Sequence, residues 1–146
     1  MRLTLFTDYG LRTLIFLALR PDALSSIAEI ASAYAISENH MVKVVHALGR
    51  AGFIETVRGR NGGLRLARAA NEIGIGEVVR AMEPGLALAG CQDGDPCAIG
   101  GLCRLEGILD EAVAALLAVL DRYTLADAVG RDCGALRLRL GLGAAL

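Results

Sequence analysis

Apolar residues in the N-terminal part of the chain recur every three or four positions in three stretches, the spacing of helices that are buried on one face. The first stretch predicts a helix over residues 7–19. In the second, Ser26 precedes Glu29 by three residues, which is the pattern of a capping box at a helix start. The third predicts a helix that is capped by Ser37 and ends at Gly52. The short break between the last two helices is typical of a helix-turn-helix.

Two short β-like segments follow, residues 53–58 and 64–68, with a glycine-rich turn between them. We expect Asn61-Gly62-Gly63 to supply residues that tolerate a positive φ in this turn. Three helices followed by a basic hairpin is the element order of a winged helix-turn-helix. A small helical domain with an unremarkable hairpin has the same order, so the hydropathy pattern by itself fixes only a mainly α fold with a small β-hairpin.

The pattern changes after a short amphipathic segment that ends before Pro84. Residues 85–101 show no useful periodicity, and a long helix with a wide apolar stripe is predicted from near Leu102 to about Tyr123. An ordinary core helix has a similar stripe, but a winged domain normally closes its core without so long an addition, which favours a dimerisation helix. We therefore divide the chain into a winged helix-turn-helix domain (1–83), a cysteine-bearing loop (84–103), a dimerisation helix with a following short helix (102–128) and a tail of unknown role without a predicted element (130–146).

The composition indicates a folded protein. Hydrophobic residues make up 54% of the 146 residues and charged residues 21%, so a core can form and extensive disorder is not expected. The longest uncharged stretch of the first helix spans residues 13–19, far short of the ~20 residues that a membrane-spanning helix needs. Because no signal peptide is visible either, we expect a soluble, cytoplasmic protein without a membrane partner.

The net charge of −1 conceals an asymmetry along the chain. Residues 37–68 contain six Lys and Arg against two Glu, whereas residues 69–146 contain six Arg against eleven acids. A confined basic segment indicates a polyanion-binding face, although a solvated surface gives the same counts. In a winged helix-turn-helix, the recognition helix enters the major groove and the wing reaches phosphates or the minor groove. The predicted DNA-binding residues are Ser37, Asn39, His40 and Lys43 on the helix and Arg58, Arg60, Asn61 and Gly62 on the wing.

The candidate chemistry lies in the loop, where Cys91, Cys97 and Cys103 occur in CQDGDPCAIGGLC. Disulfides are rare in the cytosol, and three cysteines so close together are hard to explain by core packing. Structural zinc usually takes four ligands, often in pairs two to four residues apart, and neither a nearby His nor such a pair is present. Three thiolates with an uncertain fourth ligand suit an iron–sulfur cluster better than zinc or free thiols. Cys133 is a weaker candidate for the fourth ligand.

The sequence resembles a known family in four segments: MRLTLFTDYGLRTL, ISENHMVKVVHALGRAGFIETVRGRNGGLRLA, the three cysteines and DRYTLADAV. These segments are similar to the NsrR-like nitric-oxide-sensing repressors, a winged-helix family that also includes IscR. The resemblance covers roughly residues 1 to 130. It implies a homodimer with one cluster per subunit, [4Fe–4S] in preference to [2Fe–2S], that binds palindromic promoter DNA and releases it when nitric oxide nitrosylates the cluster.

The resemblance also implies the ligand set. Cys91, Cys97 and Cys103 match the cluster ligands, and Asp8 matches an aspartate that the partner subunit contributes as the fourth ligand in some members. Judged without the family, Asp8 is a first-turn acid favoured by the helix dipole. The IscR-like members use a His three residues after the third cysteine, where this chain has Glu106.

Two other functions share these features. The same fold can sense redox state or the supply of iron and clusters, and a cluster-carrying electron-transfer or maturation protein can use a winged domain for protein contacts. An enzyme is not expected, because the sequence has no phosphate-binding loop and no nucleophile with a partnered base. Its only histidines, His40 and His46, both fall on the predicted recognition helix.

Overall fold

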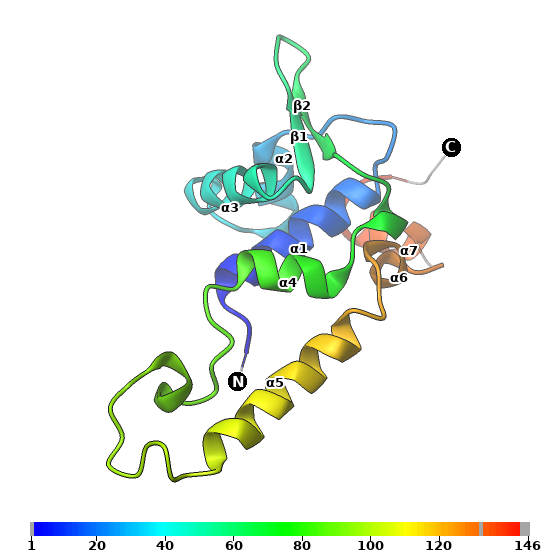
Figure 1. Ribbon diagram of the computed structural model, residues 1–146. Helices are drawn as coiled ribbons and strands as arrows, with labels where there is room; N and C mark the ends of the chain where they lie inside the picture. The colour runs from blue at the N-terminus through cyan, green and yellow to red at the C-terminus, as the bar shows by residue number, and fades with distance from the viewer. Residues whose placement is uncertain (1, 132, 144–146) are drawn as a thin grey trace.

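The structure is a computed structural model that describes residues 2–131 and 133–143 (Figure 1). The helices are α1 (Leu5–Ala18), α2 (Ile27–Tyr34), α3 (Glu38–Arg50), α4 (Ile75–Met82), α5 (Leu105–Leu120), α6 (Leu125–Val129) and α7 (Cys133–Arg139). The strands are β1 (Ile54–Val57) and β2 (Gly63–Leu66), and two short 3-10 helices are η1 (Ala70–Glu72) and η2 (Gly90–Asp93). The predicted fold class, mainly α with one antiparallel hairpin, is confirmed.

Helix α1 runs through the middle of the winged domain and packs against α3, α4, α6 and β2. It contributes Leu14, Phe16 and Leu17 to one aliphatic core, in which they are almost completely buried. Burying each such side chain stabilises the fold by about 1.5–3 kcal/mol. A single bridge between Ser25 and Leu64 joins the base of the wing to the segment before α2. The three helices and the wing therefore form one packed unit.

Two helices begin where the capping residues in the sequence predicted. Ser26 and Glu29 form the predicted capping box, with Ser26 N donating to Glu29 Oε2 at 2.6 Å and Glu29 N donating to Ser26 Oγ at 3.1 Å. Ser37 is the N-cap of α3 as predicted, but its hydroxyl makes no capping bond. Its carbonyl accepts from the backbone N–H groups of His40 and Met41 instead, which leaves the hydroxyl on an exposed residue at the surface.

The wing differs from the prediction in where its turn bends. Ile54 pairs with Leu66 and Val57 with Gly63, but the positive φ falls at Gly59, at 119°, and not within Asn61-Gly62-Gly63. Gly62 is needed for space: a Cβ there would lie 2.2 Å from the Val57 carbonyl oxygen. The glycines of the turn thus serve two purposes that a sequence pattern does not separate.

Helix α5 begins three residues later than predicted. Gly101, with φ at 78°, turns the chain just before it, so that Leu102 precedes the helix and remains 90% exposed. The helix leads from the winged domain to the cysteine loop at its far end (Figure 1). None of its 16 residues, all described by the structure, is buried.

The tail contains a helix that the sequence did not predict. Residues 133–139 form α7, and the Arg137 guanidinium donates to the carbonyl of Leu19 at the end of α1 and to those of Leu142 and Gly143. Leu140 and Leu142 pack against the core. Because these contacts are tertiary, local sequence periodicity does not reveal them. Within the described residues, no helix is long and apolar enough to cross a membrane.

Candidate functional site

Helix α3 presents one face to the core and the other to solvent. Met41, Val44, Val45 and Leu48 are buried on the inner face. Asn39, His40 and Lys43, which the sequence singled out, are exposed on the outer face. Sequence reasoning passed over Val42, an apolar side chain that is 51% exposed on the same helix. Its position outside the buried stripe was the available signal, and an apolar group here suits contact with a thymine methyl.

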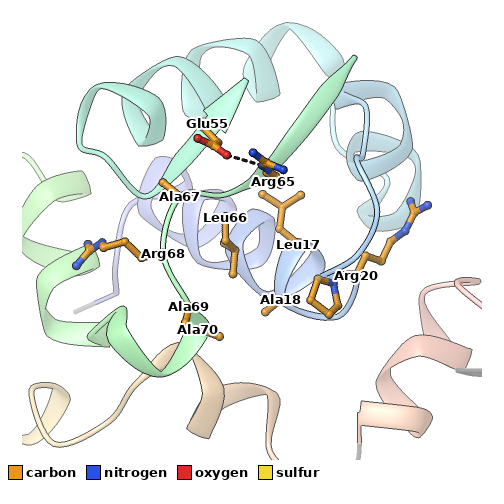
Figure 2. Close-up of a pocket in the computed structure, with 11 residues that line it drawn as sticks. Leu17, Ala18, Arg20, Glu55, Arg65, Leu66, Ala67, Arg68, Ala69 and Ala70 are labelled. Atoms are coloured by element: carbon orange, nitrogen blue, oxygen red, sulfur yellow. Dashed lines mark hydrogen bonds and ion pairs between the residues drawn. The ribbon is translucent and has the colours of Figure 1, made fainter. Parts of the chain in front are cut away.

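The wing tip carries the unpaired arginines of the hairpin. Hairpin β1–β2 projects beyond the helices (Figure 1), and Arg58, Arg60 and Asn61 are exposed at its turn. Within the part of the chain that the structure describes, neither Arg58 nor Arg60 joins an ion pair. The next two arginines along the chain are neutralised, since Arg65 pairs with Glu55 (Figure 2) and Arg68 pairs with Glu77 at 2.8 Å. The unpaired positive charge of the wing is therefore concentrated at its tip.

A cavity of about 380 Å³ lies beside the base of the wing, lined by the end of α1, β2 and the following segment. Figure 2 shows the side chains of Arg20 and Arg68 directed away from it. Arg20 pairs with Glu29 at 3.0 Å and Arg68 with Glu77. The walls that remain are mainly small and aliphatic side chains, and none of the cysteines lines this cavity.

The three loop cysteines are free thiols. Cys97 is exposed, whereas Cys91 and Cys103 are half-buried. The backbone N–H of Leu105 points at Cys103 Sγ at 3.4 Å, the type of contact that tunes thiolate ligands of a cluster.

The side chain of Gln92 orders the loop. It accepts from the N–H groups of Leu88 and Ala89 and donates to Asp110 of α5 at 2.8 Å. These bonds attach the loop around Cys91 to the start of the long helix.

The structure does not bring the predicted ligands into one cluster. Among the described residues, no group of three or more His, Cys, Asp or Glu side chains lies close enough to hold a metal ion. The donor set nevertheless fits an iron–sulfur cluster, because three accessible thiols lie on a glycine-rich loop and one already receives an N–H bond. The residues therefore fit the group chemically.

Asp8 lies in the first turn of α1 and is held by Arg12. The Arg12 guanidinium makes two contacts with the Asp8 carboxylate, both at 3.0 Å, and the Asp8 side chain is 38% exposed. Arg12 also lies over the ring of Tyr34, with 5.8 Å between the guanidinium carbon and the ring centroid. Arg12 thus orients the Asp8 carboxylate but leaves it accessible to solvent. A surface ion pair of this kind contributes only about 0–1 kcal/mol to stability. Its carboxylate can exchange Arg12 for another ligand at low cost.

A second acidic residue, missed in the sequence, joins the loop to α1. Glu83 Oε2 accepts from Thr4 N at 3.0 Å, Thr4 Oγ1 at 3.1 Å and Thr7 Oγ1 at 2.5 Å. Burial opposes ionisation of Glu83, but the hydrogen bonds from Thr7 and Thr4 together outweigh it and hold its pKa below the usual value. Glu83 is the residue immediately before the loop, so the base of the loop is attached to the helix end that carries Asp8.

These features define a winged-helix transcriptional regulator with a cysteine-bearing loop. Residues 3–131 match the Rrf2 family, described as iron-dependent transcriptional regulators, and the chain belongs to this family. The match ends where the resemblance seen in the sequence ends, just before α7.

Individual relatives of the chain are also named as transcriptional regulators. The chain is 51% identical over 132 residues to the HTH-type transcriptional regulator NsrR of Shouchella clausii strain KSM-K16, which covers 88% of this chain and 89% of that protein. It is equally similar to NsrR of Bacillus subtilis strain 168, 51% identical over 132 residues that cover 88% of this chain and 90% of that protein. Its fold resembles the solved structure of T. potens IscR with a TM-score of 0.74 and 24% identity, over 94% of this chain and 91% of that one. The chain is therefore a transcriptional regulator and not an enzyme.

Proposed function

We propose that the chain is a homodimeric repressor that senses nitric oxide through one iron–sulfur cluster per subunit. Reaction with nitric oxide lowers its affinity for palindromic promoter DNA and derepresses nitric oxide detoxification genes. The observation that carries the proposal is the set of three free, accessible cysteines on a loop attached to a winged helix-turn-helix domain. The 51% identity to regulators named NsrR supports it.

Cys91, Cys97 and Cys103 would hold the cluster, preferably [4Fe–4S], and Asp8 of the second subunit would supply the fourth ligand. The cluster would provide an iron with one non-thiolate ligand, which is the more reactive position. Asp8 exchanges its ion pair with Arg12 for this bond. Because Asp8 lies on α1, which packs directly against α3, the bond couples the cluster of one subunit to the recognition helix of the other.

Dimerisation would use α5. Leu105, Ile108 and Val119 recur on one side of it and are 50%, 60% and 43% exposed, an apolar surface that an isolated subunit leaves in water. A second α5 is the natural partner for an apolar helix face that its own domain does not cover. In this proposal, residues 1–83 bind DNA, residues 84–103 hold the cluster and residues 102–128 form the dimer.

The DNA contacts would come from Ser37, Asn39, His40 and Lys43 on α3 and from Arg58, Arg60, Asn61 and Gly62 on the wing. Lys43→Ala and Arg60→Ala are expected to weaken operator binding without changing the unfolding midpoint, because both side chains are exposed. Loss of a phosphate contact at Arg60 lowers affinity about equally for all operators and reduces the salt slope by ~1. Replacing Lys43 is expected to change the preference for particular bases, because each good base contact contributes ~1–3 kcal/mol of discrimination.

Fluorescence anisotropy at several salt concentrations measures both effects. Arg139→Ala is the matched control, since Arg139 is exposed on α7, outside the winged domain. Wild-type affinity in both test variants would contradict this assignment of the DNA-binding face.

The proposed function is tested on protein purified without oxygen. We expect a brown protein with about one cluster per subunit in its native mass spectrum. Nitric oxide should change the absorption spectrum and release the operator, while an oxidant or an iron chelator at matched dose acts more slowly. Faster release of the operator by the oxidant would favour redox sensing, and faster release by the chelator would favour sensing of iron or cluster supply. Failure to bind any promoter DNA would favour the electron-transfer or maturation alternative.

A further inference from the structure

A small apolar hollow lies between the start of α1 and the recognition helix. It has a volume of about 210 Å³, with Leu5, Phe6 and Tyr9 on one wall and His40, Lys43 and Val44 on the other. Leu5 is 56% exposed and Phe6 36%, so two large apolar side chains border the hollow without being covered. Apolar surface left in water in this way marks a contact site.

The cysteine loop carries exposed apolar side chains that need a partner. Ile99 is 58% exposed and Leu102 is 90% exposed. Both lie between Cys97 and Cys103. Residues 84–103 contain two acids, Asp93 and Asp95, and no Lys or Arg.

The hollow and the loop are complementary in charge as well as in hydropathy. His40 and Lys43 border the hollow, and Arg12, which is released when Asp8 binds the cluster of the second subunit, lies one turn further along α1. An acidic loop with two exposed aliphatic side chains matches a basic rim around an apolar floor. Within one chain, the structure leaves both surfaces exposed.

The position of Asp8 would bring the hollow of one subunit next to the cysteine loop of the other. Leu5 lies three residues before Asp8 and Tyr9 directly follows it, so Leu5 and Asp8 share a face of α1. If Asp8 binds the cluster of the second subunit, the side chains beside the cysteines of that subunit must lie against the surface around Asp8. This step rests on the proposed function.

We propose that Ile99 and Leu102 of one subunit pack into the hollow formed by Leu5, Phe6, Tyr9 and Val44 of the other. The contact closes the groove between α1 and α3 and fixes the position of the recognition helix. The alkyl stem of Lys43 lines the hollow while its ammonium remains free for DNA. The conformation of the cysteine loop thus affects the position of α3 by direct packing, in addition to the bond through Asp8.

The test uses full-length, cluster-loaded protein. Leu102→Asn and Leu5→Asn should each retain iron content and absorption spectrum but bind the operator about tenfold more weakly, within the range of ordinary coupling energies. Their cluster-free forms should match cluster-free wild type. Leu138→Asn is the matched control, because Leu138 is 76% exposed on α7.

The double variant decides whether the two residues touch. Leu5→Asn combined with Leu102→Asn should be no weaker than either single variant, since each removes the same contact. A hundredfold loss in the double variant, or wild-type affinity in both single variants, overturns the inference. Leu5→Asn keeps the test decisive if Leu102→Asn disturbs Cys103. The proposed function fails separately, when the operator affinity of wild type does not depend on its cluster.

Discussion

Cys97→Ala is expected to give a folded protein that carries no cluster and binds the operator only as cluster-free protein does. Cys97 is exposed and lies outside the buried core, so the unfolding midpoint of the winged domain should stay close to wild type. With one of three thiolates gone, the loop cannot hold the cluster. Operator affinity then falls by the full coupling between cluster and DNA, about 5–150-fold where coupling energies are typical. Iron analysis, absorption and DNA titration measure these effects.

Cys91→Ala and Cys103→Ala should behave in the same way. Cys133→Ala is the control, because Cys133 is exposed at the start of α7, a helix that lies beside α6 and away from the loop (Figure 1). It should retain iron, spectrum and affinity. Loss of iron in Cys133→Ala alone, or a full cluster in Cys97→Ala, would contradict the assigned ligand set.

The parts of the fold that the sequence predicted are those governed by neighbours along the chain. The capping box of Ser26 and Glu29 joins residues three apart, and the inner face of α3 follows from helical spacing. Both depend only on residues that are close together in the sequence. The recognition helix and the wing were therefore placed within one or two residues of their observed bounds.

The parts that were missed depend on contacts between distant residues. Arg137 reaches the carbonyl of Leu19, 118 positions earlier, and this bond with the packing of Leu140 and Leu142 holds α7 in place. Glu83 accepts from Thr4 and Thr7 across 79 and 76 positions. No local pattern encodes either contact.

The candidate site was predictable as chemistry but not as geometry. The spacing of the cysteines indicated a cluster, yet the thiols of a single chain are not assembled into a metal site within the described residues. Asp8 shows the reason most clearly, since within its own chain it pairs with Arg12. A ligand that a second subunit completes leaves no complete pattern in one sequence or in one subunit.

Asp8→Ala should still assemble a cluster on the three cysteines, but one that is more labile and has an altered absorption spectrum. The variant also loses the link from the cluster to α1, so the difference in operator affinity between its cluster-loaded and cluster-free forms falls below the typical range of about 5–150-fold, leaving the part that the packing of Ile99 and Leu102 carries. Arg12→Ala is the matched control: it breaks the same ion pair but retains the carboxylate, and should keep the cluster. Asp8→Cys should hold the cluster more firmly and slow its reaction with nitric oxide, because thiolate is the softer ligand.

A mixed dimer tests whether Asp8 acts across subunits. One subunit carries Asp8→Ala and the other carries Cys97→Ala. If the ligand crosses, the intact Asp8 of the second subunit completes the intact cysteines of the first, and one site per dimer is complete. If the ligand stays within its own chain, neither site is complete. We expect a wild-type spectrum at half occupancy, separated from the two parent dimers by affinity tags and read by absorption and native mass spectrometry. Should Asp8→Ala match wild type in both spectrum and nitric oxide rate, the coupling through α1 has no basis, and the effect of the cluster on DNA binding must reach α3 by another path.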